Sequence, residues 1–196
     1  MFQNLTNQQK GSLLAFVAVM LITPDSLLIR LSNIETWGML FYRGAIPFVV
    51  VLIGLLFFYK KNFLKALLGI GIPGIFYVIS FAACNITFLM SIQNTNVANT
   101  LVMIALAPML SAILGALFLK EAPDKKTWVA IFVTFSACVY IFHDSLKLGN
   151  VYGDLMGLAT AFGLACNATI ARYAKDRDLV PSAVIGKLCV AIFALF

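Results

Sequence analysis

The chain alternates long apolar runs with short polar segments. A helix that crosses a bilayer needs roughly 20 predominantly apolar residues, and most of the apolar runs approach that length. They predict helices over residues 11–29, 37–59, 67–92, 97–119, 127–142, 155–171 and 180–196. The stretch from Ala66 to Leu119 carries no charge and is too long for one helix, so the polar string Gln93-Asn94-Thr95-Asn96 is taken as a turn inside it.

Composition agrees with this pattern. Hydrophobic residues make up 62% of the chain and charged residues 11%, against about 45–50% and about 25% in soluble domains. Barrel strands would appear as short segments of alternating polarity, and unsatisfied backbone groups in hydrocarbon cost several kcal/mol each. The predicted fold class is therefore an all-α membrane protein, a polytopic helical bundle in a lipid bilayer.

The basic residues predict an orientation. If the helices alternate in direction, ten of the 14 Lys and Arg residues share the side of the N-terminus. These are Lys10, Lys60, Lys61, Lys65, Lys120, Lys125, Lys126, Arg172, Lys175 and Arg177. Cytoplasmic loops are enriched in basic residues, so we expect a multi-pass protein of a bacterial-type inner membrane with a cytoplasmic N-terminus. Because the charged residues sit mostly in short clusters between apolar runs, the net charge of +6 does not make nucleic acid an expected partner.

Two segments resemble each other at an offset of 142 residues. Gly11 and Arg30 bracket one apolar run, and Gly153 and Arg172 bracket another of the same length. Five predicted helices separate the two starts, and an odd number inverts the second copy relative to the first. Inverted repeats are a common construction in secondary transporters, although chance similarity stays an open alternative.

Several motifs resemble a known family. The stretch NVANTLVMIALAPMLSAILGALFLKEA, residues 96–122, has a small, polar helix start, a mid-helix proline and a glutamate just past the helix. With Arg43 early in the second helix and Gly153 opening the sixth, it is similar to the EamA type of the drug/metabolite transporter superfamily. The chain departs from that family in having alanines, near Ala130 and Ala137, where glycines are often found.

The resemblance implies an architecture and a function. The family has ten helices in two inverted five-helix repeats, so residues 1–145 would form the first repeat and residues 150–196 an incomplete second one. About seven of ten helices would then be present. The function implied is secondary transport of a small-molecule metabolite, by export or exchange through a central cavity.

Charged residues inside the predicted spans are the first candidates for the transport path. Such residues cost about 2.5–3.5 kcal/mol on insertion scales and usually mark function. Asp25 in the first helix and Arg43 in the second are expected at one depth, because a short loop joins their helices. They could form a gate pair or a clamp for a charged substrate, or a structural ion pair, and both interpretations stay open.

Uncharged polar residues extend this set. Asn85, Asn99 and Thr100 lie near the same depth as that pair, and Asn167 is opposite Asp25 in the 142-residue offset. We predict that all four line a polar cavity, with interhelical hydrogen bonding as the alternative. Pro24 and Pro108 are predicted helix kinks, because proline removes a backbone donor.

Small residues recur every fourth position in two helices. Ala107, Ser111 and Gly115 do so in the fourth helix, and Gly153 and Gly157 at the start of the sixth. This pattern is typical of close helix contacts, either within the bundle or in a homodimer.

The sequence contains no catalytic or nucleotide-binding motif. The four cysteines lie in apolar runs without a CxxC pair, so we predict no metal, no cofactor and no enzyme activity. The alternative to a transporter is a non-transporting membrane scaffold or subunit that associates through its small-residue face.

Overall fold

The computed structural model describes residues 7–22, 24–32, 34–60, 69–121, 123–148 and 151–196. The chain divides into two compact units, Met1–Ile34 and Glu35–Phe196, and each is described by itself. Within these described residues, five segments are long and apolar enough to cross a membrane. They are Gln9–Ile29, Thr36–Tyr59, Gly71–Asn94, Val97–Leu119 and Val151–Tyr173. These helices confirm the predicted all-α polytopic membrane fold.

The first unit holds two helices, α1 (Asn7–Ile22) and α2 (Asp25–Leu31). The interruption between them falls at Pro24, which stands at the N-cap of α2 and has φ −70°. Its carbonyl accepts the first hydrogen bond of α2 from the Leu28 N–H at 2.9 Å. Proline is well suited to a helix start. The first N–H groups of a helix have no acceptor within the helix, so the missing N–H of proline costs no hydrogen bond there.

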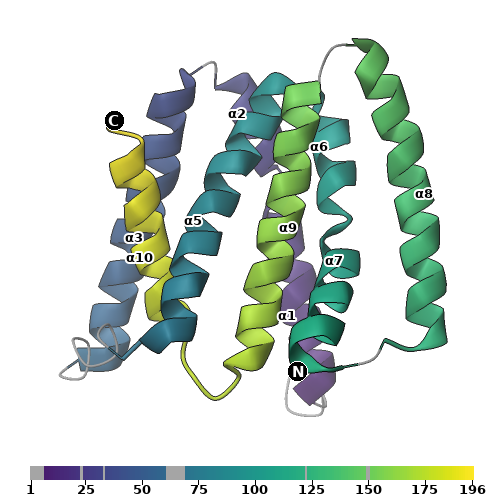
Figure 1. Ribbon diagram of the computed structural model, residues 1–196. Coiled ribbons are helices and arrows are strands. Elements are labelled where there is room, and N and C mark those ends of the chain that lie inside the picture. Colours follow the sequence, from purple (N-terminus) through teal and green to yellow (C-terminus); the bar gives the residue numbers. More distant parts are fainter. Residues whose placement is uncertain (1–6, 23, 33, 61–68, 122, 149–150) are drawn as a thin grey trace. The chain divides into compact units, whose positions relative to one another are not determined.

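The second unit contains the remaining helices, which run side by side in Figure 1. They are α3 (Thr36–Tyr59), α5 (Gly71–Asn94), α6 (Val97–Ile104), α7 (Ala107–Leu114), α8 (Lys125–Leu148), α9 (Val151–Tyr173) and α10 (Val180–Phe193). In this unit α9 packs against α5, α6 and α7, while α10 packs against α3 and α5. The centre of this unit is therefore the α5–α9 contact.

The fourth predicted helix is not continuous. It is interrupted at Ala105 and Leu106, directly before α7, in which Pro108 occupies the first turn. It ends in a π-helical turn, Gly115–Leu119, after which Lys120 adopts a left-handed φ of 57°. The Glu121 N–H then bonds to the Gly115 carbonyl at 3.3 Å.

The predicted boundaries need three corrections. The fifth helix, predicted over 127–142, extends over Lys125–Leu148, because backbone hydrogen bonding continues where hydropathy falls. The seventh, predicted over 180–196, ends at Phe193. The sixth, predicted over 155–171, spans Val151–Tyr173. The predicted start of the third helix at Leu67 lies outside the described residues.

Small residues allow the close approach of α5 and α9. A Cβ on Gly153 would lie 2.6 Å from the Thr95 backbone nitrogen, and one on Gly163 would lie 3.0 Å from Cys84 Cβ. The Ser80 hydroxyl donates to the Gly163 carbonyl at 3.1 Å across the same contact. The predicted close helix contact at Gly153 is therefore present within the chain.

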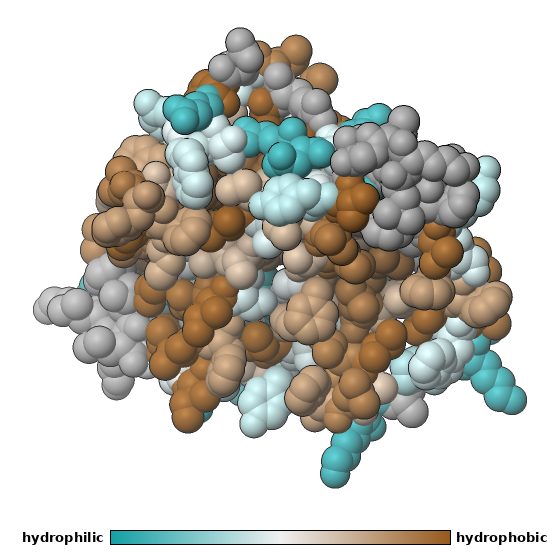
Figure 2. Space-filling view, turned by 45° about the horizontal axis from the view of Figure 1, so that its top comes forward, coloured by the Kyte–Doolittle hydropathy of each residue, from teal (hydrophilic) through white to brown (hydrophobic). Residues whose placement is uncertain are grey.

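Apolar side chains cover most of the face seen in Figure 2, and hydrophilic ones gather toward its edges. Phe57, Phe118 and Phe132 are each more than two-thirds exposed. So large an apolar surface is unusual on a soluble monomer and is what a lipid-facing surface requires.

Asp124 provides a prediction about the start of α8. Its carboxylate accepts hydrogen bonds from the Thr127 N–H at 2.8 Å and the Thr127 hydroxyl at 2.5 Å, as an N-cap residue does. The Thr127 hydroxyl and N–H stabilise the charged form and so lower the pKa of Asp124 from its ordinary value. Because the folded pKa is depressed, the cap should be fully present above the ordinary carboxyl pKa and lost as pH falls through the lowered one.

We therefore expect faster hydrogen exchange at the Thr127 amide in Asp124→Ala than in the parent at neutral pH. The two rates should converge, after correction for intrinsic exchange, at a pH below the lowered pKa. Asp124→Asn keeps a capping oxygen that does not titrate, so its protection should persist in acid. Equal protection in the parent and Asp124→Ala at neutral pH would contradict the capping role.

Candidate functional site

One face of α5 carries an alternation of aromatic and amide side chains. Phe81, Asn85 and Phe88 are spaced at i, i+4 and i+7, so they lie on one side of the helix. All three are partly buried. The Asn85 amide nitrogen donates to the Phe81 carbonyl at 2.7 Å, which leaves its side-chain oxygen available as an acceptor toward the neighbouring helix.

Lys187 of α10 contacts this face at Phe81 and Asn85. Its ammonium Nζ donates to the Asn85 Oδ1 at 2.6 Å and lies 5.3 Å from the centroid of the Phe81 ring. A cation within about 6 Å of an aromatic face is attracted by the ring quadrupole, by about 2 kcal/mol when desolvated. An amide oxygen and an aromatic ring are thus two of the groups that contact the Lys187 ammonium.

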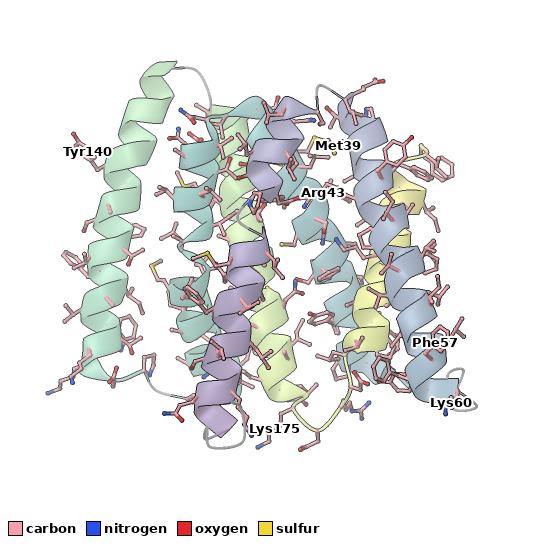
Figure 3. The ribbon with its side chains drawn as sticks, turned by 180° about the vertical axis from the view of Figure 1, so that it is seen from behind. Met39, Arg43, Phe57, Lys60, Tyr140 and Lys175 are labelled. Atoms are coloured by element: carbon pink, nitrogen blue, oxygen red, sulfur yellow. The ribbon has the colours of Figure 1, made fainter. Side chains whose placement is uncertain are left out.

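Arg43 of α3 meets the same face at Phe88, about two helical turns beyond Phe81. Its guanidinium carbon lies 5.4 Å from the centroid of the Phe88 ring. Figure 3 shows Met39 and Arg43 on the side of α3 that faces α5, in contrast to Phe57 on the outside of the helix. Two basic side chains, from two different helices, therefore converge on one stripe of α5.

A glycine next to each cation allows the helix that carries the cation to approach its neighbour closely. A Cβ on Gly44, the residue after Arg43, would lie 2.6 Å from the Ala191 backbone nitrogen of α10. A Cβ on Gly186, the residue before Lys187, would lie 2.8 Å from the Phe81 ring. Only glycine allows these approaches, which bring α3, α10 and α5 together at the level of the two cations.

The other predicted site residues lie elsewhere. The buried Thr100 of α6 shares a 2.8 Å hydroxyl–hydroxyl hydrogen bond with Ser91 of α5, and Asn99 beside it is partly buried. Asn167 of α9 is 7% exposed, and its Oδ1 has no hydrogen-bond partner within the described part of the chain. Asp25 begins α2 in the separate first unit, so its pairing with Arg43 stays a prediction.

Sequence reasoning gave no role to two of the residues found here. Lys187 was recognisable as a lone basic residue inside an apolar run, but nothing in the sequence linked it to Asn85. Asp154 is completely buried in the first turn of α9, where its Oδ1 accepts from the Thr95 hydroxyl at 2.7 Å. An acidic residue at a helix start is ordinarily solvated, so the sequence alone did not single it out.

A family model supplies the identity of the fold. The model of the EamA-like transporter family matches residues 9–143, which is more than half of the chain. The chain belongs to this family. No curated protein and no solved structure matches the chain. The predicted resemblance and the predicted class of membrane transporter are thereby confirmed, whereas the EamA match does not extend to Lys187.

A cation–carboxylate contact joins the other ends of two helices of this EamA chain. Arg172 at the end of α9 lies 3.2 Å from Glu121, which follows the π-helical turn, and each side chain is 54% exposed. Exposed pairs of this kind contribute about 0–1 kcal/mol, so packing rather than this pair holds the helix ends. Gly115 lies directly beneath it, since a Cβ there would be 3.4 Å from Arg172 Nη1.

The described residues contain no group of three or more metal-ligating side chains. Cys84, Cys166 and Cys189 are free thiols.

Proposed function

We propose that this EamA-family protein is a secondary transporter that moves a small metabolite across the membrane by alternating access. The observation that carries the proposal is the match of residues 9–143 to a family of transporters. Five helices long and apolar enough to span a bilayer agree with it. Arg43 within the candidate span Thr36–Tyr59 also supports it, because charged residues in membrane segments usually mark a transport path.

The proposal includes a topology and a direction. The basic residues at the ends of the spans favour a cytoplasmic N-terminus, and the family resemblance favours export or exchange. Transport rather than catalysis is proposed as the activity, since transport is what the family match supplies. Membership of a homodimer stays a separate proposal.

The scaffold alternative gains less support from the structure. It depends on the small-residue face of the fourth helix being available to a partner. Ala107 instead packs against the buried cluster of Met103, Leu106 and Ala161, and Gly115 is buried beneath Arg172. Most of that face is occupied by α9 of the same chain.

The test is solute flux into proteoliposomes that contain the purified chain. We expect saturable uptake of at least one labelled metabolite by the parent, and at least a tenfold loss in Arg43→Gln. The reason is that a hydrogen bond to a charged group contributes about 1.5–3 kcal/mol, which corresponds to about 10- to 100-fold in a rate or an affinity.

The matched control is Lys60→Gln. It removes one positive charge from the other end of the same helix, where Lys60 is exposed at the C-cap of α3, so its flux should equal that of the parent. Absence of flux for every solute from correctly folded parent protein would argue against transport. If Arg43→Gln instead fails to fold, the role of Arg43 is structural, and that outcome would support the scaffold.

A further inference from the structure

Asp154 is a buried carboxyl that the proposed transport path does not use. It lies in the first turn of α9, inside the candidate span Val151–Tyr173, and it is completely buried. We propose that Asp154 couples transport to protons, binding a proton when α9 is closed against the α5–α6 turn and releasing it to water when the two separate. This inference rests on the proposed transport function and deepens it by naming the coupling ion.

The two carboxyl oxygens of Asp154 have different surroundings. Oδ1 accepts a hydrogen bond from the Thr95 hydroxyl at 2.7 Å. Oδ2 is also buried, but it has no hydrogen-bond partner within the part of the chain that the structure describes. An ionised carboxylate is an acceptor at both oxygens, so the bond from Thr95 satisfies only half of the group. Oδ2 is therefore the atom at which a proton would bind.

Burial determines which form of this carboxyl a closed site favours. An ionised carboxylate is costly to remove from water unless it is paired and hydrogen-bonded, and an isolated one takes up a proton instead. The start of α9 favours a negative charge, but the cost of burying an ion is several times larger than the stabilisation that a helix end gives. Closing the site thus favours the neutral acid, and hydrating it favours the carboxylate.

The packing around Asp154 suits a proton rather than a metal ion. A Cβ on Gly153 would lie 2.6 Å from the Asn94 carbonyl carbon and from the Thr95 nitrogen, so α9 touches the backbone of the turn. In Figure 1 the start of α9 and this turn lie at the same end of the unit. A metal cation needs a shell of oxygen ligands, whereas a proton needs no added volume. Because Asp154 is in the first turn of α9, a small separation from the α5–α6 turn is enough to hydrate it.

The helices packed against this contact contribute few other titratable groups. The α5–α6 turn, α6 and α7 contain none. On α5, Tyr77 and Cys84 lie ten or more residues before the turn, and the Cys84 thiol bonds to the Thr160 carbonyl at 3.6 Å. Tyr152 on α9 is 55% exposed. The last titratable residues of α8 have side chains outside those described, and they are His143, Asp144 and Lys147.

Infrared spectroscopy of the purified full chain in nanodiscs tests proton binding directly, because a protonated carboxyl has a carbonyl stretching band that a carboxylate lacks. We expect this band in the parent at neutral pH, its loss in Asp154→Asn, and its retention in Asp176→Asn, which removes an exposed carboxyl. Thr95→Val should strengthen the band, since the Thr95 hydroxyl supports the charged form. Identical bands in the parent and in folded Asp154→Asn overturn the proposal. If Asp154→Asn does not fold, an unchanged band in Thr95→Val overturns it.

Solute flux into proteoliposomes tests the coupling. A gradient of one pH unit can drive about a tenfold accumulation for each coupled proton. The parent should accumulate its labelled metabolite when the gradient is imposed, whereas Asp154→Asn should only equilibrate it. His143→Gln is the control, because histidine is the side chain that ordinarily titrates near neutral pH, and it should accumulate the metabolite as the parent does. Accumulation that persists in folded Asp154→Asn, or that is lost only in His143→Gln, overturns the proposal.

The two proposals fail differently. Saturable flux that responds to no pH gradient, in the parent as in Asp154→Asn, would leave transport standing and remove the proton coupling. An acid band that depends on Asp154, with no flux of any solute through the parent, would leave proton binding standing and remove transport.

Discussion

Gly153→Ala is expected to lower the free energy of unfolding by about 1–3 kcal/mol, the usual cost of overpacking a tight contact. A Cβ at this position would lie 2.6 Å from the Asn94 carbonyl carbon and from the Thr95 nitrogen. Both are backbone atoms of the turn between α5 and α6, so no side-chain rotation can relieve the overlap. Either α9 or the turn must shift, and the α5–α9 contact at the centre of the second unit loosens.

Thermal unfolding of the purified chain in nanodiscs measures this effect. Gly54→Ala is the matched control, because a Cβ on Gly54 would meet no atom within 4 Å and alanine is the better helix former. At Gly157 the nearest atoms are the Ser91 hydroxyl at 3.0 Å and Met103 Cβ at 3.1 Å, which can move, so Gly157→Ala should fall between the two. Equal unfolding midpoints for Gly153→Ala and Gly54→Ala would show that the close approach at Gly153 is not required.

The helices themselves were predictable from hydropathy, since apolar length is a physical requirement of the bilayer. The positions of helix breaks could also be predicted, because Pro24 and Pro108 cannot donate a backbone hydrogen bond to the preceding turn. The ends of the helices were harder to predict. Helix α8 continues to Leu148, beyond the predicted end at residue 142, because a helix need not stop where its composition turns polar.

The candidate site was only half predictable, for a geometric reason. Position along a run gives the depth of a residue, and depth placed Arg43 and Asn85 at neighbouring levels. It does not give the rotation of a helix about its axis, which decides which residues face one another. That rotation is set by contacts such as Gly44 with Ala191 and Gly186 with Phe81, and these pairs are too far apart in sequence to be matched by pattern.

The same limit applies to the predicted polar cavity. Thr100 bonds to Ser91, whereas Asn85 bonds to Lys187, so two residues predicted to share one cavity take partners on different helices. The small residues predicted more of the packing, because the four-residue spacing of Gly153 and Gly157 places both on one helix face that another segment can approach closely. The spacing could not predict which segment packs there, and that segment is the α5–α6 region of the same chain.

Asp154→Ala is expected to destabilise the protein by about 1–3 kcal/mol, the cost of disrupting a buried hydrogen bond. Asp154 is completely buried, and its Oδ1 accepts from the Thr95 hydroxyl at 2.7 Å. Its position in the first turn of α9 also favours a negative group, because the helix N-terminus carries partial positive charge. Alanine removes the acceptor and leaves a cavity in the contact between α9 and the α5–α6 turn.

Two controls separate these causes. Asp154→Asn keeps an oxygen that can accept from Thr95, so it should cost less than Asp154→Ala, whereas Asp176→Ala removes an exposed acidic residue and should change stability little. A double-mutant cycle of Asp154→Ala with Thr95→Val isolates the hydrogen bond itself. Strictly additive effects in that cycle would mean that the burial of Asp154, rather than its bond to Thr95, holds α9 to the turn. Non-additivity of about 1 kcal/mol is expected, because each single variant already breaks the same bond.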